Sequence, residues 1–329
     1  MKLEKNIPSI YCFPQGIGDF LHVLDRFLLG HLEKDYNDKD IFILQYDQQK
    51  IILNFLIKKK TNVFLTTDIK KKPLILFKLI FKIIKKKFKL LIIEPNISKK
   101  KSLFLSLITR YQQRYTSLDK DLKFTKLNKV TNYDIIYNHI HLSKNKRSLS
   151  DYFVKSKNLN QKFNIGISAG SGELEKHKRW PKIYFSDLIN ILLKYDNNAH
   201  IHLYGSDREY KLNKDIYDKV DNKYKHQVLI FKDFDIIKSL NSIKNLDLFI
   251  ANDNGLSHAA HLMNVRTIAI YGPTDEKDHG TFENRHIVKK NIECAPCYHK
   301  MRFGCGNELC LKTLSPEFVF NKFMNVLNS

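Results

Sequence analysis

The chain lacks the uninterrupted run of ~20 apolar residues that a membrane-spanning helix needs. Its most apolar stretch, Lys72–Ile93, is broken by lysines every few residues (KPLILFKLIFKIIKKKFKLLII). The first twenty residues, MKLEKNIPSIYCFPQGIGDF, lack the apolar core and the small-residue cleavage site of a signal peptide. We therefore expect a cytoplasmic protein whose five cysteines are mostly reduced thiols.

Acidic residues are scarce relative to basic ones. The chain has 34 Asp and Glu against 56 Lys and Arg, which gives a formal net charge of +22. This charge permits an anionic partner such as a nucleic acid or a membrane surface, but it identifies none, because lysines on solvated faces are common. With 43% hydrophobic residues, the 329-residue chain has a globular composition and is long enough for two domains.

Short apolar runs alternate with amphipathic segments, which is the pattern of parallel sheets with crossover helices. We expect strands at residues 7–13, 41–45, 63–65, 90–93, 133–137, 163–168, 200–204, 228–232, 246–251 and 266–271. We expect helices at residues 20–32, 51–57, 74–86, 181–194, 236–243 and 256–263, and a further helix after the GSDREY segment.

The best candidate for a linker is the polar stretch that follows Leu142 and ends at Lys162. The predicted fold is α/β, with two Rossmann-like domains whose parallel sheets face a central cleft. We place the acceptor-binding domain at residues 1–155 and the donor-binding domain at residues 156–329, and we expect the last helix to pack back on the first domain.

The segment SAGSGELEKHKRWP directly follows a predicted strand. Its glycine-serine turn allows backbone N–H groups to approach a phosphate, and three cations follow. The residues concerned are Gly170, Ser171, Gly172, Lys176, Lys178 and Arg179. Trp180, the only tryptophan, precedes a proline suited to the first position of a helix, and we expect it to be a packing anchor. The alternative is an ordinary turn with solvated lysines.

The segment NLDLFIANDNGLSHAAHLM predicts a buried strand, a turn and a helix with His258 in its first turn. Ligands bind at the carboxyl ends of strands in open α/β sheets, and helix N-termini favour anions. Asp253 and Asn254 are therefore candidate ligand-binding residues, although either could simply cap the helix. Gly272 and Thr274 end another strand at the same edge, where the alternative is a plain β-turn.

Asp19 follows the first predicted strand and its two glycines, in PQGIGDFLH. A carboxylate at such a strand end is placed to act as a general base. The alternative is an ordinary acidic residue at the start of a helix.

Four of the five cysteines lie within seventeen residues, in CAPCYHKMRFGCGNELC. Their spacing suggests a structural zinc site or, less readily, an iron site, with free thiols or an inducible disulfide as alternatives. The proposed ligands are Cys294, Cys297, Cys305 and Cys310.

Together these segments resemble glycosyltransferase family 9, the bacterial heptosyltransferase-like enzymes of lipopolysaccharide core assembly. The resemblance lies in GIGDFLH, SAGSG…KRWP, LYGSDRE, NDNGLSHAAHLMNVRTIAIYGPTD and CAPC…C…C, in this order. It implies a GT-B fold and an inverting transfer from a nucleotide-activated sugar, often ADP-heptose, without a catalytic metal.

The resemblance also implies roles for single residues. Asp19 would deprotonate the acceptor hydroxyl, and Lys178 would neutralise the donor diphosphate. Glu209 would hold the ribose or base, and Asp253 would bind the sugar. The backbone of Asn254, Gly255, Leu256 and His258 would cradle the diphosphate, beside the glycine turn and with Gly272 and Thr274 completing the donor site.

Two departures bear on the donor. The family's glycine turn more often begins His-Pro-Gly, whereas this chain has Ser168-Ala169-Gly170, and its loop before Lys178 is longer. The donor could therefore be a different nucleotide sugar, used with a lipopolysaccharide core or another surface glycan as acceptor.

The basic helix at 74–86 suits a lipid-linked acceptor at the inner membrane face, or it packs in the core with a solvated basic face. Two rival functions are a basic nucleic-acid-binding protein with a zinc knuckle, and a sugar-nucleotide epimerase or non-catalytic glycan protein. We expect no nucleic-acid partner, because nucleic-acid binding does not explain the polar residues at two strand ends.

Overall fold

The computed structural model describes residues 7–14, 16–24, 37–57, 61–93, 99–116, 162–232, 235–276, 285–297 and 305–328. The chain divides into two compact units, Met1–Arg147 and Ser148–Ser329. The predicted boundary between residues 155 and 156, the predicted linker except Lys162, and the strand predicted at 133–137 lie outside the described residues.

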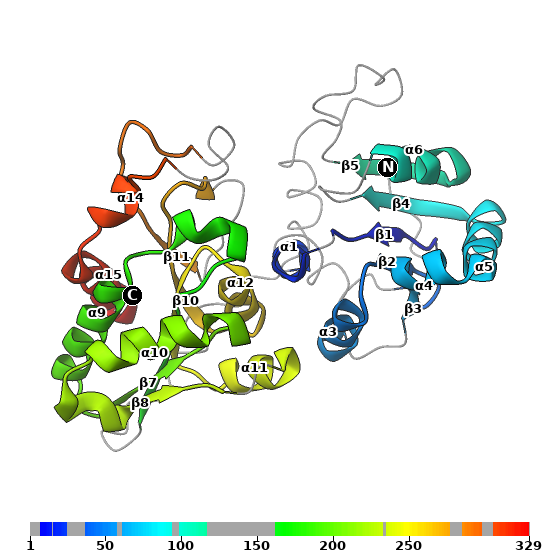
Figure 1. Cartoon of the computed structure of the whole chain (residues 1–329). Coiled ribbons are helices and arrows are strands. Elements are labelled where there is room, and N and C mark those ends of the chain that lie inside the picture. The colour runs from blue at the N-terminus through cyan, green and yellow to red at the C-terminus, as the bar shows by residue number, and fades with distance from the viewer. Residues whose placement is uncertain are drawn as a thin grey trace. The chain divides into compact units, whose positions relative to one another are not determined.

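The first unit contains a five-stranded parallel sheet with the strand order β3-β2-β1-β4-β5 (Figure 1). Its strands are β1 (Ile10–Cys12), β2 (Ile41–Leu44), β3 (Asn62–Leu65), β4 (Lys87–Ile93) and β5 (Arg110–Thr116). Its helices are α1 (Ile17–Val23), α3 (Asp47–Ile57), α4 (Thr66–Lys71), α5 (Pro73–Ile84) and α6 (Lys99–Ile108). The sequence pattern did not predict α4, α6 or β5.

The second unit contains a six-stranded parallel sheet with the order β11-β10-β9-β6-β7-β8. Its strands are β6 (Phe163–Ser168), β7 (Ala199–Leu203), β8 (Val228–Ile230), β9 (Leu248–Asn252), β10 (Arg266–Ile270) and β11 (Arg285–Val288). Its helices are α9 (Lys182–Tyr195), α10 (Tyr210–Lys219), α11 (Ile236–Ile243), α12 (Gly255–Leu262), α14 (Leu309–Lys312) and α15 (Pro316–Asn328). Short 3₁₀ turns cover Glu173–Lys178, Asp207–Glu209 and Asn222–Gln227. Strand β11 was not predicted. The strand at residues 266–271, which we expected to be the last, corresponds to β10 and is followed by β11.

Both faces of the second sheet are covered, which explains why its central strands are apolar along their whole length. Every residue of β9 and β10 is buried. Ile250 packs into the core under α9 and α15, whereas its neighbours Phe249 and Ala251 pack into the core under α11 and α12. The alternation follows the pleat of the strand and gives three layers.

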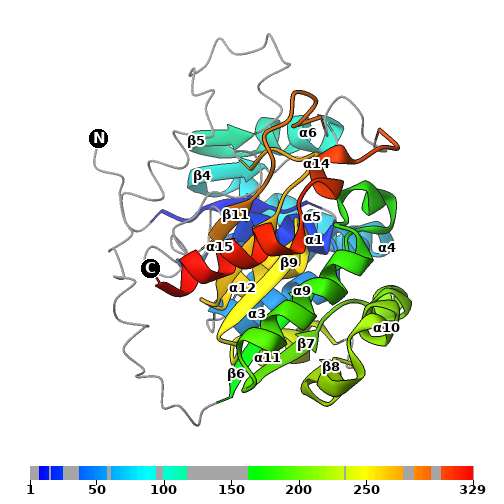
Figure 2. The same ribbon diagram turned by 90° about the vertical axis from the view of Figure 1, so that its left-hand side faces the viewer.

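The last helix belongs to the core of the second unit. Helix α15 packs against α9 and β11, and Val319, Phe323 and Val326 are buried there (Figure 2). The expectation that this helix packs back on the first domain stays a prediction.

Candidate functional site

Asn252, the last residue of β9, ties the loop after β6 to the centre of the sheet. Its side-chain amide donates to the carbonyl of Ala169 at 2.8 Å and accepts the backbone N–H of Trp180 at 3.1 Å. Asn252 is fully buried. Because these two bonds hold both ends of the 169–180 loop, the loop is fixed against the carboxyl end of β9.

Trp180 is the predicted packing anchor, and this is confirmed. Its indole is buried, donates to the carbonyl of Leu314 at 2.8 Å, and packs edge-to-face on Tyr184 and Phe185. The start of α9 is therefore fixed just after the cations of the loop.

Asn254 joins the start of α12 to the glycine turn. Its side-chain oxygen accepts the N–H of Ser257 at 3.0 Å, so it is the N-cap of the helix. Its side-chain nitrogen donates to the Ser168 hydroxyl at 3.0 Å and to the Gly170 carbonyl at 2.9 Å. The cap is thus Asn254, which leaves the side chain of Asp253 to other contacts.

Lys178 is a buried cation between two carboxylates. Its Nζ lies 3.0 Å from Glu175 Oε1 and 3.5 Å from Asp253 Oδ2. The side chains of Lys178 and Asp253 are only 8% and 6% exposed. A buried charge needs a partner of opposite charge, so these carboxylates hold the ammonium group where β6 and β9 end.

Arg179 holds the glycine turn. Its Nε and Nη2 donate to the hydroxyl and the carbonyl of Ser171, both at 3.0 Å, and Nη2 lies 3.9 Å from Glu209 Oε1. The other carboxylate oxygen of Glu209 accepts the N–H and the hydroxyl of Ser206. Ser206 and Glu209 also form a capping box, in which the Ser206 side chain accepts the backbone N–H of Glu209. Glu209 is therefore held on two sides at the carboxyl end of β7.

The remaining predicted donor residues lie close to these loops. His258 is buried in the first turn of α12, and Gly255 and Leu256 beside it are half-buried. Thr274 is buried after β10, and its hydroxyl has no hydrogen-bond partner among the described residues. Gly172 is exposed, whereas Gly272 is buried.

All these loops follow the carboxyl ends of four adjacent strands, β10, β9, β6 and β7. The structure therefore brings Lys178, Asp253, Asn254, Gly170, Ser171 and Glu209 into one network of bonds. Glu175 and Asn252 were not predicted from the sequence, and Arg179 was predicted only as one of three cations in the loop. A signal for Asn252 existed, since it is a polar residue that closes an apolar, buried strand.

Asp19 lies in the first unit. It is an exposed residue in the first turn of α1, whose N-cap is Gly16. A β-carbon on Gly16 would stand 3.1 Å from Asp19 Oδ2, so the carboxylate lies close to the backbone of that glycine. The predicted role of Asp19 as a base stays a prediction.

The four cysteines of the predicted metal site differ in environment. Cys294 and Cys305 are exposed, Cys297 is half-buried and Cys310 is buried. Burial, with the three other thiols nearby, raises the pKa of Cys310 to about 11. In the part of the chain that the structure describes, no three His, Cys, Asp or Glu side chains are arranged to hold a metal ion. The zinc site stays a prediction.

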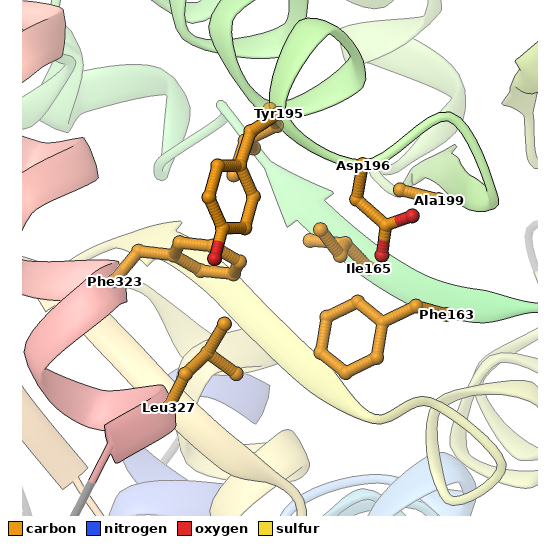
Figure 3. A pocket seen from close by; sticks show the side chains of 8 residues that line it. Phe163, Ile165, Tyr195, Asp196, Ala199, Phe323 and Leu327 are labelled. Carbon is orange, nitrogen blue, oxygen red and sulfur yellow. The ribbon is translucent and has the colours of Figure 1, made fainter. Parts of the chain in front are cut away.

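A small cavity lies between β6, α9 and α15 (Figure 3). Phe163, Tyr195 and Phe323 surround it, and its volume is about 10 Å³. This is the lower limit for one water molecule. Its lining includes Phe163 and Ala199, the first residues of β6 and β7, so it lies at the opposite end of these strands from the network. We interpret it as a packing gap.

Two Rossmann-like α/β units with polar loops at the carboxyl ends of the strands define the class of ligand-binding α/β proteins. The model of glycosyltransferase family 9 (heptosyltransferase) matches residues 55–305, and the chain belongs to this family.

Curated relatives carry heptosyltransferase names. Lipooligosaccharide heptosyltransferase 2 of Campylobacter jejuni (strain ATCC 700819 / NCTC 11168) is 30% identical over 170 residues, which are 50% of each chain. Lipopolysaccharide heptosyltransferase 2 of Salmonella typhimurium is 22% identical over 222 residues, 66% of this chain and 61% of that protein. The match thus spans about half to three fifths of the length of these relatives.

Solved structures share the whole fold. The structure of E. coli ADP-heptose lps heptosyltransferase II has a TM-score of 0.67 at 15% identity and covers 98% of this chain and 99% of its own. The glycosyl transferase family 9 structure from Veillonella parvula has a TM-score of 0.69 at 15% identity, with coverage of 100% and 99%. At this identity the likeness establishes the GT-B fold that the sequence predicted, which is confirmed.

Proposed function

We propose that this protein is an inverting glycosyltransferase. It would move heptose or a related sugar from a nucleotide-diphosphate donor, first of all ADP-heptose, to a lipopolysaccharide core or another surface glycan. The observation that carries the proposal is the burial of Lys178 between Glu175 and Asp253, beside the N-terminus of α12. The names of the curated relatives support the sugar and the acceptor.

In the proposed reaction, Lys178 and α12 stabilise the leaving group. The bond between the anomeric carbon and the diphosphate oxygen breaks, and negative charge gathers on the diphosphate. The first N–H groups of a helix have no partner within that helix, so those of Gly255 and Leu256 would donate to the diphosphate. A fixed ammonium group and fixed N–H groups stabilise such charge without reorganising.

The acceptor needs a base, because a hydroxyl is a poor nucleophile at neutral pH. We assign this role to Asp19, which takes the hydroxyl proton as the oxygen attacks the anomeric carbon from the side opposite the diphosphate. The configuration of the sugar is thereby inverted. A positioned base of this kind contributes roughly 10²–10⁴-fold to the rate.

Two carboxylates would recognise the neutral parts of the donor. Asp253 would accept hydrogen bonds from the sugar hydroxyls, and Glu209 from the ribose or the base. Because Glu209 is already held by Ser206 and Arg179, its orientation is set before the donor arrives.

We propose that a metal takes no part in this transfer, since the cation and the helix N-terminus supply the positive charge. The proposal includes a cytoplasmic location and no nucleic-acid partner. Chelation with EDTA is expected to leave the rate of transfer unchanged, and a rate that EDTA abolishes and added metal restores would contradict metal independence.

The test of the function is a panel of ADP-, UDP-, GDP- and CMP-sugars. A donor bound at one hundred times its Kd stabilises the folded chain by about 2.7 kcal/mol, so one member should raise Tm clearly. The nucleotide sugar that raises Tm should also be consumed when a glycan acceptor is present. Asp19→Asn should abolish this consumption but keep the rise in Tm. A panel that leaves Tm unchanged would contradict the proposed function.

A further inference from the structure

Helix α5 is apolar on both of its faces. Leu79 and Ile83 point into the core of the first unit, where they are buried with Phe88 and Leu91. The opposite face carries four large apolar side chains that are 48–66% exposed: Leu74, Phe77, Phe81 and Ile84. A surface helix of a soluble domain normally carries polar residues on its outward face. An apolar outward face therefore indicates an interaction surface.

Helix α6, the neighbour of α5, also carries exposed apolar side chains. It packs against α5, and both helices are seen in Figure 1. Leu103 is 62% and Leu107 is 77% exposed, with Phe104 beside them, while Leu105 is turned into the core. We call the seven exposed side chains of the two helices the α5–α6 patch. Among the described residues they are seven of the sixteen exposed large apolar side chains, so the patch is a concentration and not scatter.

Lysines are interleaved with the patch. Residues 70–93 contain nine lysines and no acidic residue. Lys78 and Lys85 are exposed and lie within one helical turn of Phe77 and Phe81 on the outward side of α5. The ammonium group of Lys85 lies 4.0 Å from the centre of the Phe81 ring.

We propose that the α5–α6 patch docks on the surface of an anionic lipid bilayer. The cores of protein–protein interfaces are depleted in lysine, whereas helices that lie in a membrane interface combine Phe and Leu with Lys. The apolar side chains enter the boundary between headgroups and acyl chains, and the lysines contact anionic headgroups while their stems lie along the apolar surface. This surface lies outside the donor network and does not depend on the proposed function.

Co-sedimentation of the full chain with lipid vesicles tests this proposal. We expect binding to vesicles of phosphatidylglycerol and phosphatidylcholine, weak binding to phosphatidylcholine alone, and loss of binding at high salt. Phe77→Ser/Phe81→Ser should lower the fraction bound by at least roughly tenfold. The control Leu229→Ser/Phe318→Ser removes two exposed apolar side chains from the second unit and should bind like the parent chain.

Charge is tested separately with two triple variants of equal net charge. Lys78→Gln/Lys82→Gln/Lys85→Gln should weaken binding to anionic vesicles and flatten its salt dependence. Lys211→Gln/Lys214→Gln/Lys219→Gln on α10 changes the same number of exposed lysines and should have little effect. Equal losses in both triple variants, or no loss in the Phe77/Phe81 variant, would overturn the proposal. Sedimentation velocity provides a further check. If the parent chain is a dimer and the Phe77/Phe81 variant is a monomer, the patch binds a second copy of the chain, and the proposal is overturned.

The far-UV circular dichroism spectrum and the Tm of each variant, without any ligand, should match those of the parent chain. A variant that keeps both has kept its fold, so a loss of vesicle binding then reports on the patch itself.

Discussion

The carboxylate of Glu209 lies against the α-carbon of Gly170, so closely that a β-carbon there would stand 1.8 Å from Oε1 and 2.2 Å from Cδ. No side chain other than hydrogen fits unless Glu209 moves. The turn after β6 and the turn after β7 are thus matched to each other, and the position of Glu209 depends on a glycine that lies 39 residues earlier in the sequence.

Gly170→Ala should therefore act through Glu209. The end of a flexible side chain can swing away, so we expect a stability loss of no more than about 1 kcal/mol and a roughly tenfold rise in the KM for the donor. Kinetics of Gly170→Ala, Glu209→Ala and the double variant form a thermodynamic cycle.

The double variant should be no worse than Glu209→Ala alone, because both changes remove the same interaction. Leu174→Ala, at a side chain in the same loop that is 76% exposed, is the control and should leave the KM for the donor unchanged. Fully additive effects of the two single changes would contradict this coupling.

Asn252→Ala should destabilise the second unit. The change leaves the carbonyl of Ala169 and the N–H of Trp180 without their partner in a buried site. Each such group costs roughly 1–3 kcal/mol, so the free energy of unfolding should fall by about 2–4 kcal/mol in urea titration. Asn245→Ala, at an exposed amide, should change it by less than about 0.5 kcal/mol. Equal losses for both variants would show that Asn252 does not hold the loop.

Glu175→Gln should strengthen donor binding. The Glu175 carboxylate pairs with Lys178 and is 33% exposed, so it competes with the donor diphosphate for the same ammonium group. Removing its charge should lower the donor Kd by roughly three- to tenfold, a modest effect because solvent screens a partly exposed pair. Glu173→Gln, in the same turn but paired with exposed Lys176, should leave Kd unchanged. Weaker binding by Glu175→Gln would mean that this carboxylate is needed to position Lys178.

Stability should fall as the pH is lowered from about 7 towards 5. Burial lowers the pKa of His177, His202 and His286, and the charge of Lys178 adds to this effect at His177. Below the unfolded pKa of 6.5 the unfolded chain binds protons that the folded chain resists, so acid favours unfolding until the pH passes below the folded pKa values. Urea titrations across this range check the slope. His202→Gln should make it shallower, and a slope of the opposite sign would contradict the assignment.

The fold was largely predictable because parallel strands buried on both faces stand out as apolar runs. The four strands and four helices predicted from Phe163 to Met263 all lie within a few residues of the observed ones. Strand β5, RYQQRYT, was missed because its composition is polar, and β11 because its four residues carry no clear period.

The sequence located the residues of the candidate site but not the bonds between them. Glycines, Lys178 and Asp253 are found at strand ends, which the alternation of elements locates. The contacts of Arg179 with Ser171 and Glu209 depend on the adjacency of β6 and β7, and so does the contact of Glu209 with Gly170. Strand order follows from tertiary packing, and no local pattern in the sequence encodes it.

The central claim is that Lys178, among the cations of its loop, neutralises the donor. The decisive measurement is the transfer rate and donor Kd of Lys178→Ala beside Lys176→Ala. Lys176 is only two residues away, but its side chain is 66% exposed. We predict that Lys178→Ala lowers kcat by at least roughly 10²-fold and that Lys176→Ala changes it less than about twofold. Equal activity of the two variants would contradict the account.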